Sequence, residues 1–241
     1  MCRMALFLSK QPALFMDSIL FREWAVSNPD GLGAFFRHAD GMKLVKKSNP
    51  FSYFREGKPY TRLLMHFRMG TGGKGVHPFY CKCRSSNAWL VAHNGAIGFD
   101  KEFLEQMHKH HKIETEIDSE IIAHIWQDLS STADLSQRAI ALHDVLVANS
   151  SHMWANVLLY NYITDSWVGM SDGALNLVSS DKNLTLASDL RWLRIQRPNL
   201  LTKNLQSGDL IVGRGLSYKI YEQAIPSKSY LSFYEYPYGE W

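Results

Sequence analysis

Apolar residues in the first part of this chain fall into short runs that are typical of β-strands. A longer apolar stretch at 13–26 predicts a helix, which the turn signal Asn28-Pro29-Asp30-Gly31 ends. A second turn, Ala39-Asp40-Gly41, lies between two of the short runs and predicts a hairpin. The predicted strands of this part are 2–8, 32–37, 42–47, 62–68 and 88–94.

The middle of the chain changes to a helical period. Asp118 precedes apolar residues with the spacing of one helix face, and a second set follows from Leu135 to Leu146 at i, i+4, i+7 and i+11. Strand-like runs then return at 155–160, 167–170, 175–178, 184–187 and 210–212. Strands, then helices, then strands favour a layered α+β domain with largely antiparallel sheets. The segment 218–241, rich in Tyr and Pro, is assigned to no element.

Composition narrows the class of protein. The chain has 241 residues without a linker-like or repetitive stretch, so one domain spanning 1–241 is the simplest account. A net charge of +3 without a long Lys/Arg block argues against a nucleic-acid partner. No stretch approaches the roughly 18 apolar residues that span a bilayer, and the run 4–8 is too short for a signal peptide. The 3 cysteines indicate a reducing compartment, so we expect a cytoplasmic protein without membrane contact.

Cys2 is the first residue that could take part in catalysis. Removal of Met1 would leave a thiol and a free α-amine on one residue. An α-amine has a pKa near 7.7–8.0, so it can take the thiol proton and activate the sulfur as a nucleophile. The alternative is that Cys2 is a small hydrophobic residue at the start of a strand.

A second candidate follows the predicted strand 62–68. Arg68 offers a planar fork for a carboxylate, and Thr71 adds a hydroxyl donor beside it. The glycines from Gly70 to Gly75 would allow the backbone to approach a ligand closely. The alternative is that they form an ordinary flexible loop. A phosphate-binding loop is excluded, because Gly73-Lys74 is followed by Gly75 in place of Ser or Thr.

Two further motifs have an equally ordinary alternative. In Ala92-His93-Asn94-Gly95, the Asn94 amide and the Gly95 N–H can converge on an oxyanion, but Asn-Gly is also the commonest tight-turn pair. Asp118 can face a substrate ammonium, but Thr115-x-x-Asp118 also resembles a helix capping box.

Metal chemistry has weaker candidates. His108, His110 and His111 lie among lysines, and we interpret them as a solvated loop. Cys81-Lys82-Cys83 lacks the second cysteine pair of a zinc site. His143 and His152 are interpreted as incidental. We therefore predict no metal site and no cofactor.

The order of these motifs resembles one family, the class II glutamine amidotransferases among the N-terminal nucleophile hydrolases. The resemblance covers about residues 2–130 and continues loosely through Leu186-Ala187-Ser188-Asp189 and Ser207-Gly208-Asp209-Leu210. Two departures are Asp30-Gly31-Leu32-Gly33, which is similar to free-standing members, and Met69, where many members have an aromatic residue. The motifs that carry the resemblance are Cys2, His66-Phe67-Arg68-Met69-Gly70-Thr71, His77-Pro78-Phe79, His93-Asn94-Gly95 and Asp118-Ser119-Glu120.

The resemblance implies a four-layer αββα sandwich and a set of residue roles. Cys2 would attack the side-chain amide of glutamine, with Asn94 and Gly95 holding the oxyanion. Arg68 and Thr71 would bind the substrate α-carboxylate, Asp118 would bind its α-ammonium, and His93 would also belong to the substrate site. No cofactor is implied, and a separate synthase is the expected ammonia acceptor. The alternatives are a hydrolase of γ-glutamyl amides or peptides, and a catalytically silent binding module.

Overall fold

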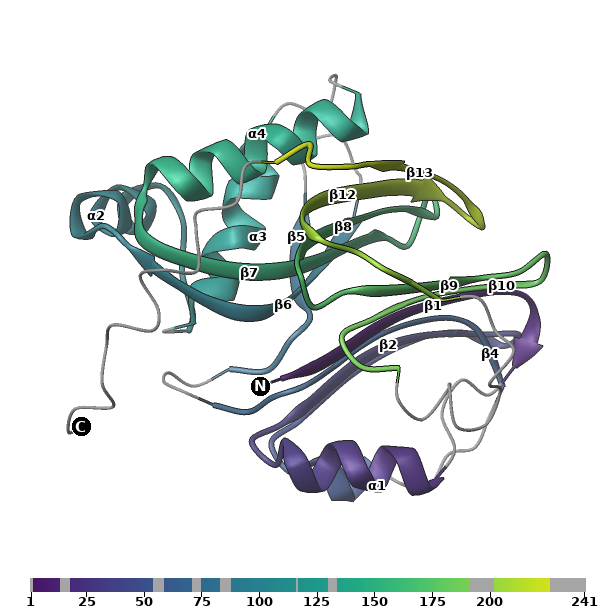
Figure 1. Ribbon diagram of the computed structural model, residues 1–241. Coiled ribbons are helices and arrows are strands. Elements are labelled where there is room, and N and C mark those ends of the chain that lie inside the picture. The colour runs from purple at the N-terminus through teal and green to yellow at the C-terminus, as the bar shows by residue number, and fades with distance from the viewer. Residues whose placement is uncertain are drawn as a thin grey trace.

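The computed structural model in Figure 1 stacks two β-sheets face to face and covers both outer faces with helices. It describes residues 2–13, 18–53, 59–70, 75–82, 88–115, 117–129, 134–190 and 202–225. Helix α1 (Ser18–Ser27) lies outside one sheet, and α2 (Lys101–His110), α3 (Asp118–Asp128) and α4 (Leu135–Ala148) lie outside the other. The predicted α+β four-layer sandwich is confirmed.

The first sheet contains the strand that follows Cys2. Its order is β11-β9-β10-β1-β4-β2-β3, and a short 3₁₀ helix at Pro50–Tyr53 follows β3. Every pair of neighbours in it is antiparallel. The strands are β1 (Arg3–Ala13), β2 (Leu32–His38), β3 (Gly41–Lys47), β4 (Tyr60–Phe67), β9 (Asn176–Ser179), β10 (Asn183–Ala187) and β11 (Thr202–Asn204).

The second sheet has the order β13-β12-β8-β7-β6-β5 and is also antiparallel. Strand β13 occupies part of the segment 218–241, which the sequence pattern left unassigned. The strands are β5 (Phe79–Lys82), β6 (Ala88–Phe99), β7 (Ser150–Asn161), β8 (Ser166–Asp172), β12 (Ser207–Arg214) and β13 (Ser217–Tyr221).

One predicted helix start and one predicted loop are wrong. The helix predicted at 13–26 begins too early, since β1 extends to Ala13 and α1 spans Ser18–Ser27. The supposed loop around His108 and His110 belongs to α2, whose Met107 is buried against the second sheet. Its polar composition concealed a narrow apolar face, because Phe103, Leu104 and Met107 stand at helical spacing.

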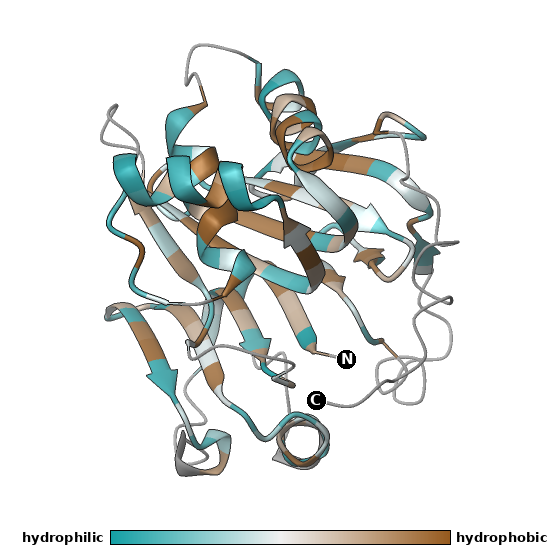
Figure 2. Ribbon diagram, turned by 90° about the vertical axis from the view of Figure 1, so that its left-hand side faces the viewer, coloured by the Kyte–Doolittle hydropathy of each residue, from teal (hydrophilic) through white to brown (hydrophobic). Residues whose placement is uncertain are grey.

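Alternation along the strands divides the core into layers. Met4, Leu6 and Leu8 of β1 point between the sheets, whereas Ala5 and Phe7 point toward α1. In Figure 2, hydrophobic segments gather in the strands of both sheets and in the helices that cover the second sheet. Within the described residues, no helix is both long and apolar enough to cross a membrane.

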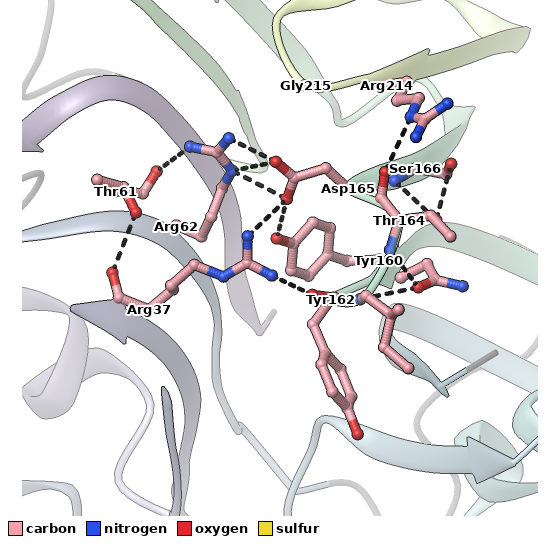
Figure 3. A network of polar contacts seen from close by, with 12 residues as sticks. Arg37, Thr61, Arg62, Tyr160, Tyr162, Thr164, Asp165, Ser166, Arg214 and Gly215 are labelled. Carbon is pink, nitrogen blue, oxygen red and sulfur yellow. Dashed lines mark hydrogen bonds and ion pairs between the residues drawn. The ribbon is translucent and has the colours of Figure 1, made fainter. Parts of the chain in front are cut away.

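One polar network joins the two sheets, as Figure 3 shows. Asp165, in the β7–β8 turn, accepts hydrogen bonds from Arg62 of β4 (2.5 and 3.0 Å) and from the buried Tyr160 hydroxyl (2.6 Å). Arg37 of β2 pairs with the same carboxylate at 3.4 Å and donates to the main-chain oxygen of Tyr162. Burial opposes ionisation of Asp165, but the bonds from Arg62 and Tyr160 hold the carboxyl pKa below its usual value.

We expect Asp165→Asn to lower the free energy of unfolding by about 1–3 kcal/mol, because two half-buried arginines lose their shared anion. Asn tolerates the left-handed backbone at this position, where φ is 61°. Urea denaturation measures the change. The exposed pair Lys203–Glu222 (2.7 Å) provides the control, and Glu222→Gln should leave the midpoint unchanged. Equal effects of the two variants would contradict the assigned role of the network.

Candidate functional site

Cys2 precedes β1 at one end of the sandwich and is half-buried. By the alternation of β1, its side chain falls on the same face as Met4, between the sheets. The Met69 N–H donates to Sγ at 3.3 Å, and Sγ lies 3.5 Å from the Met69 oxygen. Burial raises the pKa of the Cys2 thiol, and the Met69 N–H and the charge of Arg68 partly oppose this increase. The thiol therefore needs a base to become a nucleophile.

The residues next to Cys2 are held by the segment that follows β10. Ser188 Oγ accepts from the Met4 N–H at 3.0 Å, and the Ser188 N–H donates to the Met4 oxygen at 3.0 Å. Arg3 forms an ion pair with the buried Asp189 at 3.3 Å. The sequence pattern identified Ser188-Asp189 as a motif but indicated no role for it. These contacts fix the main chain on which Cys2 is carried.

Arg68 leaves the end of β4 and is fixed through its main chain. Its N–H donates to the Gly31 oxygen at 2.8 Å, and its oxygen accepts from the Asp30 N–H at 3.1 Å. The Asp30 carboxylate accepts from the Gly70 N–H at 2.7 Å. The Arg68 guanidinium lies over Gly70, since a Cβ at Gly70 would be 3.3 Å from Cζ and both Nη atoms. Thr71 lies outside the described residues.

Asn94 and Gly95 lie within β6, which continues unbroken from Ala88 to Phe99. The tight-turn interpretation of Asn-Gly is therefore wrong, because both residues pair with β7. Asn94 is 1% exposed and shares the inter-sheet face of β6 with Leu90 and Ala92. Its Nδ2 is buried without a hydrogen-bond partner among the described residues. Such a group is costly in a resting structure and is an available donor for a bound oxyanion.

Gly95 tolerates no side chain. A Cβ at this position would lie 1.8 Å from the Trp154 oxygen and 2.8 Å from His93 Nε2. The conflict with the backbone of β7 cannot be relieved by a rotamer change. Glycine is therefore required here by the close approach of the two strands and not by a turn.

Asp118 is the first residue of α3, and its carboxylate turns toward β6. Oδ2 accepts from the Ile97 N–H at 2.8 Å, and Oδ1 accepts from Ser119 Oγ at 3.1 Å and lies 3.7 Å from His93 Nδ1. Burial disfavours the charged form, but the nearby His93 and these hydrogen bonds leave the pKa of Asp118 lowered overall.

The predicted capping box is wrong. The N-cap position of α3 is Ile117, and no side chain caps it. Thr115 bonds instead to Glu120, whose Oε2 accepts from the Thr115 N–H and hydroxyl at 2.6 Å each. Asp118 does not cap α3, because its carboxylate accepts a hydrogen bond from the Ile97 N–H at the edge of β6.

That strand edge brings Gly95 and Asp118 together. Among the described residues, β5 pairs with β6 only as far as Val91, so beyond this point the edge has no neighbouring strand. N–H groups two residues apart point to the same edge of a strand, so the Gly95 N–H points to the side on which Asp118 bonds to Ile97. His93 instead faces α3, where Nδ1 lies 3.0 Å from Ser119 Oγ.

A buried pair of histidines lies beside Arg68. The sequence placed His66 and His77 in separate motifs and did not predict that they contact each other. The two Nδ1 atoms of His66 and His77 are 3.0 Å apart. The main chain of His77 passes so close to Gly33 that a Cβ there would be 1.3 Å from the His77 oxygen. Burial, with the neighbouring charges of His93 and Arg68, lowers the pKa of His66 to about 3, and burial beside His66, His93, Lys46 and Arg68 lowers that of His77 well below its usual value.

The pair predicts a loss of stability in acid. Both imidazoles stay neutral in the fold but protonate in the unfolded chain below their ordinary pKa of 6.5. Their contribution is therefore complete above pH 6.5 and declines as the pH falls toward 3, by about 1.4 kcal/mol per pH unit for each group. Urea denaturation at pH 7, 6 and 5 measures the slope, which His66→Asn should reduce. The exposed His110→Gln is the control, and an equal slope in both variants would refute the assignment.

The remaining sequence candidates lie elsewhere. Among the described residues, no group of three or more His, Cys, Asp or Glu side chains could hold a metal ion. Cys81 is buried in β5, and Cys83 lies outside the described residues. His111, just beyond α2, bonds to Asp128 at 2.7 Å.

The architecture matches solved structures closely enough to compare. Glutamine phosphoribosylpyrophosphate amidotransferase from B. subtilis superimposes with a TM-score of 0.69 at 15% identity, over 95% of this chain and 50% of that one. A glutamine aminotransferase class-II domain protein from Silicibacter pomeroyi gives 0.60 at 12% identity, over 92% of this chain and 99% of that one. This chain has the class II glutamine amidotransferase fold.

A third match, the allosteric regulatory enzyme of purine biosynthesis, gives a TM-score of 0.67 at 14% identity. The chain spans 50% of the length of that protein and of the B. subtilis enzyme. No family model matches the sequence, and no curated protein does. These identities of 12–15% show a shared fold, and the roles of individual residues are inferred from the geometry of the site.

Proposed function

We propose that the protein is an amidohydrolase of the class II glutamine amidotransferase type, with Cys2 as its nucleophile after removal of Met1. The observation that carries the proposal is the buried Asn94 Nδ2, which has no partner among the described residues and lies on the face toward which Cys2 points. The proposed substrate is glutamine, which is hydrolysed to glutamate and ammonia.

Substrate binding would use opposite charges at the two ends of the site. The Arg68 guanidinium would bind the α-carboxylate, with Thr71 as a second donor. The Asp118 carboxylate, ionised at neutral pH, would bind the α-ammonium. A zwitterionic amino acid needs one site of each sign, and these residues supply both. His93 would act from the other face of β6 by fixing the start of α3 through Ser119.

The reaction then needs no group beyond the chain and water. The α-amine of Cys2 takes the thiol proton, and the thiolate adds to the amide carbon. The Asn94 amide and the Gly95 N–H stabilise the resulting oxyanion. The C–N bond breaks, and ammonia leaves with the proton held by the α-amine. Water then hydrolyses the glutamyl thioester to glutamate and restores the thiol.

Two details of the proposal concern what lies outside the site. Ammonia would pass to a separate synthase, because the B. subtilis neighbour is by its name an amidotransferase, an enzyme that transfers the nitrogen of an amide to an acceptor. The second candidate is hydrolysis of γ-glutamyl amides or peptides, favoured by the exposed Met69 beside Cys2, whose side chain would contact a leaving group larger than ammonia.

Mass spectrometry combined with a glutamate-release assay tests the proposal. The purified protein should lack Met1 and release glutamate from glutamine. A much higher kcat/KM for γ-glutamyl peptides would favour the second candidate. Protein without Met1 that hydrolyses neither substrate would leave a binding module with the same fold and would refute the enzymatic proposal.

A further inference from the structure

Asn156 lies opposite Asn94 in the ladder between β6 and β7 and is fully buried. Its Nδ2 donates to the main-chain oxygen of Asn94 at 3.3 Å. Its Oδ1 accepts from the N–H groups of Asp172 at 2.9 Å and Ala174 at 3.2 Å. Because each bond satisfies a buried polar group, the side chain holds its partners in one arrangement.

The oxygen that Asn156 holds belongs to the same peptide unit as the N–H of Gly95. A peptide unit is planar and trans, so its C=O and N–H point in opposite directions. The ladder already directs the Asn94 oxygen toward β7, and the side-chain bond from Asn156 adds a second donor that holds this oxygen, and with it the Gly95 N–H, in that direction. The added bond also polarises the unit, which makes that N–H a stronger donor.

The other two bonds of Asn156 connect this peptide to the first sheet. Asp172 ends β8 in the second sheet, and β9 begins at Asn176 in the first. Strand β9 pairs with β10, and β10 pairs with β1, which follows Cys2. Asn156 thus joins the Asn94–Gly95 peptide to the β8–β9 connection. This connection links the sheet with the proposed oxyanion site to the sheet with the proposed nucleophile.

We propose that Asn156 is a positioning residue that sets the Asn94–Gly95 peptide plane for oxyanion binding. The inference rests on the proposed function for its kinetic consequence, but its structural consequence can be measured without any activity. Asn156 contacts no reacting atom in this proposal. It acts through the peptide that it orients.

The test variant is Asn156→Asp, which keeps the shape and the acceptor but loses the donor to the Asn94 oxygen. We expect kcat for glutamine to fall by about 10- to 100-fold, while KM changes by less than about threefold. Alkylation of Cys2 by iodoacetamide should keep its rate, because displacement at a saturated carbon forms no oxyanion. General structural damage would slow both reactions.

Asn161 on the same strand offers a matched control. It is also buried, and its Oδ1 also accepts from two main-chain N–H groups, those of Ile163 (2.9 Å) and Thr164 (3.0 Å). Its Nδ2, however, has no partner among the described residues. Asn161→Asp therefore introduces the same chemical change on the same strand without a lost bond, and it should retain kcat.

The amide resonance of Gly95 in a ¹⁵N-labelled sample gives the readout that is independent of activity. It should shift in Asn156→Asp and stay in place in Asn161→Asp. If Asn156→Asp does not fold, Asn156→Ser, too short to reach the Asn94 oxygen, takes its place in each measurement. An unmoved Gly95 resonance, an unchanged kcat in an active enzyme, or an equal loss in Asn161→Asp would overturn the inference. A wild-type protein without amidohydrolase activity would instead refute the proposed function, and the resonance would still decide the role of Asn156.

Discussion

Cys2→Ala is expected to lower the rate of glutamate release by at least about 10⁴-fold, because the proposed reaction has no other nucleophile. Alanine is small, so removal of Met1 should proceed as in the wild type and does not confound the comparison. The folded state should persist, since among the described residues the hydrogen bonds of Sγ involve the main chain of Met69. A glutamate-release assay with mass spectrometry of both proteins measures the effect.

Cys81→Ala is the matched control for this loss. Cys81 is a buried cysteine in β5, and its side chain packs in the core beneath α3 and α4. Its replacement removes a thiol without touching the proposed site, so we expect full activity with a small loss of stability. Activity retained in Cys2→Ala, or lost equally in Cys81→Ala, would exclude Cys2 as the nucleophile.

The second large effect is expected from Asn94→Ala. Loss of one oxyanion donor should lower kcat by about 10²- to 10³-fold. Stability should change little, because the Nδ2 atom that is removed forms no hydrogen bond among the described residues. Steady-state kinetics and thermal denaturation of the same sample measure both quantities.

Asn161→Ala should show the opposite behaviour. The replacement removes two hydrogen bonds to the main chain of the β7–β8 turn, so the midpoint of denaturation should fall while kcat stays unchanged. The turn lies at the end of the sandwich away from Cys2, since Arg62, which binds Asp165 there, pairs with Leu8, whereas Phe67 pairs with Arg3. An Asn94→Ala variant that loses stability and activity together would argue for a structural role.

Local pattern was sufficient for most of the described strands, because apolar alternation is a property of neighbouring residues in the sequence, but it missed the short strands β5, β11 and β13. It failed at α2, where a narrow apolar face is hidden among lysines and histidines, and at the start of α1, where β1 continues beyond its apolar run. The residues that could take part in catalysis were also identifiable from the sequence. Cys2, Arg68, Asn94 and Asp118 carry the functional groups that the proposed reaction needs.

Tertiary structure decided how those groups are used, because each depends on contacts between segments far apart in the chain. Asn94-Gly95 forms no turn since β7 pairs along it, and Asp118 caps no helix since the edge of β6 offers it an N–H. The roles of Ser188, His77 and Asn156 depend on partners more than ten residues away, and no local pattern specifies them. The sequence alone therefore determined which residues could do chemistry, and the packing of the two sheets determined which of them face one another.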